Sequence, residues 1–233
     1  MESSVLSCLV NIFVDPKQAL TDIRSHTQWL WYPLIIAIVI SVGFSLWYFL
    51  TVDMDWFVNQ TLAQMSAKIP ADRLDQIRQH MSRQRFIVGS LIGTPLFMIA
   101  VYLLQTVYLF LISKLVGSEV QSFGQWFSFT SWTYLPNALA SVASAIAYLF
   151  ASGRQVSLYK LDVTSLNTLL FHLPRSNHWF GTLQGLHLTL FWALGLMIVG
   201  FSMWTKKGIG KSSAIVLAPY VVIYGVIVII KLM

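Results

Sequence analysis

The sequence predicts an all-α protein: a polytopic membrane helix bundle with five transmembrane helices and short amphipathic helices at its amino terminus. Hydrophobic residues make up 56% of the 233 residues and charged residues only 10%, whereas charged residues are about 25% of a soluble domain. Five apolar stretches recur, each near the length of about 20 residues with which a helix crosses a ~30 Å hydrocarbon layer. They cover residues 31–52, 86–112, 126–151, 181–203 and 213–230.

The first segment, residues 1–28, is expected to be amphipathic and to lie in the membrane interface. Apolar residues recur there at helical spacing up to Phe13, which is typical of an interfacial helix. Asp15 and Pro16 predict the start of a second short helix, because aspartate accepts hydrogen bonds from free helix amides and proline fits the first helical position. This helix should reach about Ser25. Three of its side chains are expected to face the membrane: Ala19, Leu20 and Ile23.

Residues 29–233 are expected to form the five-span membrane domain. Its loop at 53–85 is polar and helix-prone, and Pro70 divides it. We expect a solvated helical hairpin that caps the bundle or, alternatively, a lid over a partner or substrate. Prolines interrupt three spans and should kink them, which serves either helix packing or the shaping of a cavity. They are Pro95, Pro136 and Pro219.

The predicted spans contain almost no ionisable residues, and His187 is the clearest exception. This pattern disfavours a proton relay of acidic side chains, because ion-coupled transporters retain buried charge for that purpose. Gln184 and His187 lie three residues apart and would share one face of the fourth predicted span. They would form either hydrogen bonds between helices or an intramembrane polar face inside the bundle.

Composition and motifs also disfavour several function classes. The net charge of +6 without a Lys/Arg run indicates contact with anionic headgroups rather than with nucleic acid. The lone Cys8 allows no internal disulfide and no cysteine metal cluster, and the histidine spacing matches no metal motif. Residues 208–212 look like the tail of a phosphate-binding loop, but Thr205 stands where its first glycine belongs. We therefore predict no catalytic residue, no metal, no cofactor and no enzyme activity.

The charge distribution leaves the orientation of the chain open. An amino terminus inside the cell would place six Lys/Arg residues on the cytoplasmic side and the other nine outside, against the usual excess of positive charge inside. The cluster of Lys206, Lys207 and Lys211 in a short loop favours the inside placement.

Two stretches resemble the Yip-one (Ypt-interacting protein) domain family, in particular its small prokaryotic members. The first is the opening segment 13–24, which carries Phe13, Asp15, Pro16, Ile23 and Arg24. The second runs from a glycine-containing turn into the third predicted span and carries Gly117, Phe123, Tyr134 and Pro136. Five spans in a chain of this size also match the family.

The resemblance implies a five-helix bundle with a cytoplasmic amino terminus, located in the bacterial inner membrane. Eukaryotic relatives bind small GTPases through a long cytosolic amino-terminal region. Only about 28 residues precede the first predicted span here, so GTPase binding is not expected to carry over.

Two functional hypotheses follow. The first is a non-enzymatic integral membrane protein that organises the lipid bilayer, further copies of itself or other membrane proteins. Asp15 and Pro16 would fix the angle between the amino-terminal helices, while Phe13, Leu20 and Ile23 would anchor them in the membrane. The alternative is a small transporter, channel or lipid-moving protein with a path between kinked helices.

Overall fold

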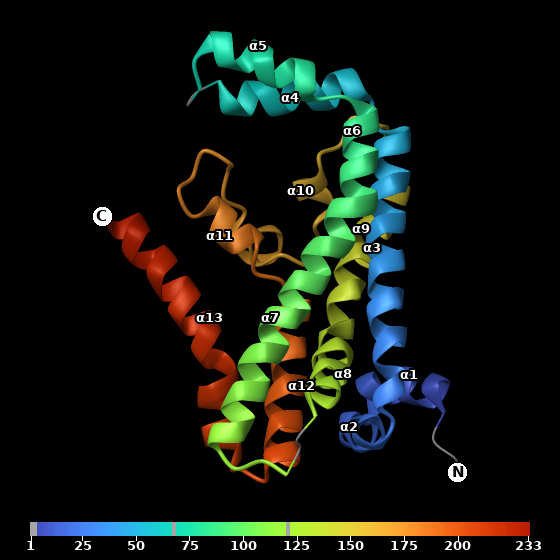
Figure 1. The fold of residues 1–233 in the computed structure, drawn as a ribbon. Coiled ribbons are helices and arrows are strands. Elements are labelled where there is room, and N and C mark those ends of the chain that lie inside the picture. Colours follow the sequence, from blue (N-terminus) through green and yellow to red (C-terminus); the bar gives the residue numbers. More distant parts are fainter. Residues whose placement is uncertain (1–3, 67–68, 120–121) are drawn as a thin grey trace. The chain divides into compact units, whose positions relative to one another are not determined.

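The computed structural model describes residues 4–66, 69–119 and 122–233, which are largely helical and contain no β-strand (Figure 1). The all-α fold class is therefore confirmed. Contacts between residues divide the chain into two compact units. Unit 1 comprises Met1–Ala37, Met98–Leu139 and His187–Met233, and unit 2 comprises Ile38–Phe97 and Ala140–Leu186.

The helices follow one another with mostly short connections. In the first half of the chain they are α1 (Val5–Val14), α2 (Pro16–Ser25), η1 (Thr27–Leu30), α3 (Trp31–Thr51), α4 (Met54–Met65), α5 (Ala71–His80), α6 (Arg83–Val88), η2 (Gly89–Gly93) and α7 (Thr94–Leu115). In the second half they are α8 (Phe123–Tyr134), η3 (Leu135–Asn137), α9 (Ala138–Leu149), α10 (Leu158–Leu161), η4 (Asn167–Phe171), α11 (Phe180–Gln184), α12 (Leu188–Thr205) and α13 (Ile209–Leu232).

Four continuous helical segments of the described chain are long and apolar enough to cross a membrane. They are Thr27–Thr51, Arg83–Leu115, Leu188–Thr205 and Ile209–Leu232. The third predicted span is present as α8 and α9, which the 3₁₀ turn η3 separates at Pro136. The fourth predicted span begins at Leu188 and not at Gly181, because α11 ends at Gln184 and the chain is extended at His187. The protein is thus an integral, multi-pass membrane protein.

Helix α8 is the centre of unit 1, because every residue from Trp126 to Tyr134 is buried. It contacts α2, η1 and α12. Trp204 of α12 packs against the rings of Phe129 and Trp126, with centroid distances of 4.9 and 5.5 Å. Its indole Nε1–H also donates a hydrogen bond of 2.9 Å to the backbone carbonyl of Leu20 in α2. One tryptophan therefore joins the amino-terminal helices to the middle of the bundle.

The predicted orientation of α2 is wrong. Its side chains Ala19, Leu20 and Ile23 are fully buried instead of facing the membrane. The reason is that α2 packs on α8 and α12, so its apolar stripe meets protein. An apolar stripe in sequence looks the same whether lipid or another helix covers it.

Unit 2 has a separate aromatic core around Tyr48 of α3 and Tyr148 of α9. The hydroxyl of Tyr48 donates to the carbonyl of Val156 at 2.8 Å, and Thr51 and Tyr148 share a 2.8 Å hydrogen bond. Arg83 donates to the carbonyl of Val52 at 3.0 Å, and so satisfies one of the free carbonyls at the end of α3. Segment 53–85 holds α4 and α5, which contact each other in Figure 1.

The close approach of α2, α8 and α12 can be tested at Gly200. A Cβ atom at this position would lie 2.9 Å from Leu20 Cδ2 and closer still to the ring of Phe129. We expect Gly200→Ala to lower the free energy of unfolding by about 1–3 kcal/mol, as overpacked cores do. The measurement is thermal or denaturant unfolding in detergent.

Gly195 provides the matched control, because the same helix carries it and nothing lies within 4 Å of a Cβ placed there. Gly195→Ala should be neutral or stabilising by about 0.5–1 kcal/mol, since alanine is the better helix former. Equal stability of the two variants would contradict the packing described here.

Candidate functional site

The family-like residues of the opening segment shape the junction of α1 and α2. Asp15 lies between the two helices, and its Oδ1 accepts a hydrogen bond of 3.2 Å from the backbone N–H of Gln18. Pro16 occupies the first turn of α2, where its missing N–H leaves no helical bond unmade. The N–H of Asp15 also donates to the carbonyl of Asn11 at 2.8 Å. These bonds fix the chain between the two helices.

Phe13 also packs on protein, although it is not fully buried. Its ring meets that of Trp192 in α12 edge-on, with the centroids 6.0 Å apart. The expectation that Phe13, Leu20 and Ile23 form membrane anchors is therefore wrong for Leu20 and Ile23, which lie in the core.

Arg24, in the last turn of α2, is part of a small network of charged side chains. Its guanidinium lies 3.6 Å from Glu119 in the α7–α8 loop, and Glu119 also accepts a 2.6 Å hydrogen bond from Lys206 after α12. The hydrogen bond and charge of Lys206 hold the pKa of Glu119 below its usual range. Gln125 adds a 3.3 Å hydrogen bond from its Nε2 to the Arg24 carbonyl. The carboxylate thus links three segments at the same end of unit 1.

The second group of family-like residues holds the connection from α7 into α8. Gly117 has φ of 70°, a left-handed conformation that glycine adopts without a steric penalty. Phe123 packs edge-on against Phe110 of α7, with centroids 5.7 Å apart. Tyr134 ends α8 deeper in the unit, where its hydroxyl lies 2.6 Å from that of Tyr220 in α13. Pro136 sits in the 3₁₀ turn that separates α8 from α9.

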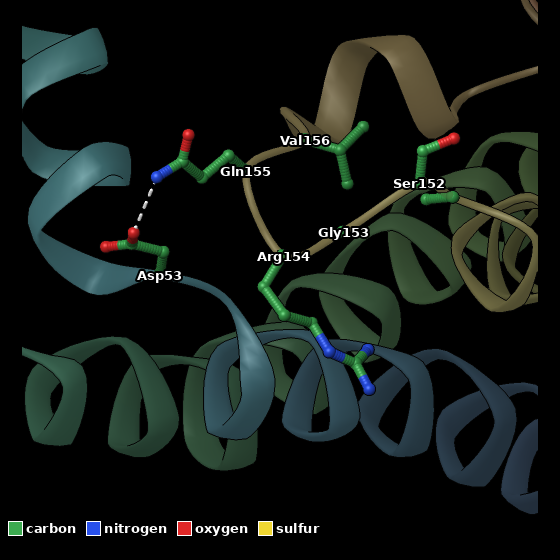
Figure 2. A pocket seen from close by; sticks show the side chains of 7 residues that line it. Asp53, Ser152, Gly153, Arg154, Gln155 and Val156 are labelled. Carbon is green, nitrogen blue, oxygen red and sulfur yellow. Dashed lines mark hydrogen bonds between the residues drawn. The ribbon is translucent and has the colours of Figure 1, made fainter.

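A separate polar recess lies in unit 2, where Asp53 faces the segment 151–156 (Figure 2). The recess has a volume of about 560 Å³. Asp53 accepts hydrogen bonds from the N–H of Trp56 at 3.0 Å and from Nε2 of Gln155 at 2.8 Å. These two bonds lower the pKa of the Asp53 carboxyl. Figure 2 shows the Arg154 side chain extending away from Asp53, and its guanidinium lies over the ring of Tyr148.

The chemistry of this recess is structural. Both carboxylate oxygens of Asp53 are engaged in holding the start of α4 against the chain after α9. Within the described ranges, no three His, Cys, Asp or Glu side chains gather in a way that could hold a metal ion.

The comparisons with known proteins agree with the resemblance in the sequence. The family model described as the Yip1 domain matches residues 10–230, nearly the whole chain. The chain belongs to the Yip1 domain family. No curated protein and no solved structure matches it. The family-like residues of this Yip1 domain protein all belong to unit 1, and those of the opening segment lie where α1, α2, α8 and α12 meet.

Gln184 and His187 do not share one helix face in this Yip1 domain protein. Gln184 is the last residue of α11, whereas His187 precedes α12 with an extended backbone, so they share no helix. Gln184 instead donates to Asp162 at 3.0 Å and accepts from Asn167 at 3.3 Å. Its polar groups are satisfied inside unit 2.

Sequence reasoning missed the residues that tie the segments together. Glu119 and Trp204 belong to no sequence motif that would single them out. Gln105 and Tyr220 are likewise part of no recognisable motif. Their partners are distant in the chain, and no local pattern could have revealed them.

Proposed function

We propose that this Yip1 domain protein is a non-enzymatic organiser of the membrane that acts through a platform formed by α1 and α2. The observation that carries the proposal is a row of exposed aliphatic side chains on α1. Leu6, Val10 and Val14 are 73%, 55% and 77% exposed and recur every fourth residue, so they share one face of the helix.

The other face of α1 is fixed to the protein. Cys8 and Ile12 are completely buried, and α1 contacts α2. Full burial of a Leu or Val side chain contributes about 1.5–3 kcal/mol relative to exposure in water. One face of α1 packs on protein and the other is aliphatic. Such a helix is expected to lie at the boundary between lipid headgroups and acyl chains.

The platform is coupled to the bundle and is flanked by positive charge. The hydrogen bond from Trp204 to Leu20 ties α2 to α12. Exposed basic side chains lie on α2 and in the first turn of α13, namely Lys17 and Lys211. Each such charge near an anionic surface is worth about 1 kcal/mol. Shallow insertion of α1 into one leaflet would spread the headgroups and curve the bilayer.

Basic side chains also support a cytoplasmic amino terminus in a bacterial inner membrane. Lys206, Lys207 and Lys211 lie within or beside the short turn between α12 and α13, which is where positive charge has the most influence on orientation. Arg83 is used structurally, because it binds the carbonyl of Val52.

The first test replaces the aliphatic row by Leu6→Gln, Val10→Gln and Val14→Gln in the full chain. Removal of residues 1–28 would be less informative, because it also takes Leu20 and Ile23 out of the core. We expect the folded variant, reconstituted in anionic phospholipid vesicles, to lose most of the curvature that the parent protein induces, as measured by cryo-electron microscopy of vesicle diameters.

A paired variant with Gln18→Ser and Thr21→Ser changes exposed polar side chains on the neighbouring helix and should behave like the parent. Vesicles of the same diameter with the parent and with the triple variant would disprove the proposal.

The second test addresses orientation with single cysteines at exposed positions before and after α3, Gln18→Cys and Gln79→Cys. Burial raises the pKa of the native Cys8 thiol to about 12, so Cys8 should react little with maleimides. In intact cells, an impermeant maleimide should label the cysteine at 79 and reach the one at 18 only after permeabilisation. The reverse pattern would show an external amino terminus.

A further inference from the structure

Unit 2 contains a small pocket between α4, the start of α10 and the chain before α11. Its volume is about 170 Å³, below the roughly 300–1,000 Å³ of pockets that hold drug-sized ligands. Much of its wall is apolar and consists of Trp56, Phe57 and Leu158. The pocket therefore has room for one chemical group of a ligand rather than for a whole cofactor.

Arg175 gives this pocket a positive charge. Among the described residues that line the pocket it is the only charged one. Its guanidinium lies 4.1 Å from the ring centroid of Tyr159 and 5.8 Å from that of Phe180. It forms no ion pair with an acid of the described ranges, and its side chain is exposed. Because a guanidinium has five N–H donors and no acceptor, a ligand beside it has to supply acceptor atoms.

Ser157 supplies a second group without a partner. The residue lines the pocket and is only 7% exposed, and its hydroxyl makes no hydrogen bond within the described part of the chain. Buried hydroxyls nearly always have a partner. A water molecule would satisfy the hydroxyl alone, whereas an anion would satisfy the hydroxyl and offset the charge of Arg175.

The walls of the pocket are fixed to the end of a span. Tyr48 lies in the last turn of α3, which ends the apolar segment Thr27–Thr51. Its ring packs against that of Phe57, with centroids 6.2 Å apart, and its hydroxyl donates to the carbonyl of Val156, next to Ser157. A span ends where the hydrocarbon layer meets the headgroups, so the anion that the pocket meets there is the phosphate of a phospholipid.

We propose that the pocket binds the phosphate group of a phospholipid headgroup. The guanidinium of Arg175 and the hydroxyl of Ser157 donate to its non-ester oxygens, while Phe57 and Leu158 contact the adjoining glycerol. A hydrogen bond from a guanidinium to phosphate is about twice as strong as one between neutral groups, so Arg175 contributes most of the affinity. The site is independent of the platform on α1.

The test measures binding of dihexanoyl phosphatidylglycerol to the full chain in detergent by native mass spectrometry. Dihexanoylglycerol, hexanoate and inorganic phosphate are the comparison probes. The phospholipid should bind more strongly than each of them, because it alone combines the phosphate with an acylated glycerol.

Two variants remove the proposed partners one at a time. Arg175→Gln should weaken phospholipid binding by about tenfold or more, as expected for a hydrogen bond to a charged group. Ser157→Ala should weaken it by about two- to tenfold, as expected for a neutral hydrogen bond. Arg73→Gln is the matched control, because it removes the same charge from an exposed position on α5 outside the lining and should leave binding unchanged.

Ser157→Ala deletes a single oxygen and decides the matter if Arg175→Gln fails to fold. Equal binding of the phosphate-free lipid, preference for hexanoate, equal losses in Arg73→Gln and Arg175→Gln, or binding unaffected by Ser157→Ala would each overturn the proposal. Inorganic phosphate that binds as tightly as the phospholipid would identify a soluble anion as the ligand and overturn the assignment to lipid.

Discussion

The hydrogen bond between the Trp204 indole and the Leu20 carbonyl is the constraint on which the rest of unit 1 depends. Both residues are buried, and a buried carbonyl without a donor would be costly. Because this bond fixes α2 against α12, Ile23 lies in the core and Arg24 reaches Glu119. The exposed row on α1 has the same cause. Helix α2, held in place by this bond, covers only one face of α1 and leaves the opposite face exposed.

Three prolines in the apolar segments have three different local consequences. Pro136 divides the third predicted span into α8 and α9, so the central helix ends at Tyr134. Pro219 leaves α13 continuous but frees a carbonyl that Tyr108 satisfies from α7. Pro95 stands in the first turn of α7, directly after the π-helical turn η2. A proline in a span therefore predicts a local break in hydrogen bonding but not how the fold repairs it.

The sequence predicted the fold class and the approximate position of the apolar helices, because hydropathy and length determine both. It also predicted the start of α2, since Asp15 and Pro16 act within one turn. The predictions from sequence were wrong for features that depend on contacts between residues far apart in the chain. The stripe of Leu20 and Ile23 meets protein, and the helix break after Gln184 places Gln184 and His187 on different elements. Tyr134 lies within hydrogen-bond distance of both Gln105 and Tyr220, which no local pattern connects.

The most direct test of the central constraint is hydrogen exchange of the amides of residues 5–25 in Trp204→Phe, which removes the donor to Leu20 and retains an aromatic ring. Trp31→Phe, at a tryptophan that is 58% exposed, is the comparison. The account predicts that protection of α1 and α2 falls about tenfold or more in Trp204→Phe and is unchanged in Trp31→Phe. Unaltered protection in Trp204→Phe would show that this bond does not hold the amino-terminal helices.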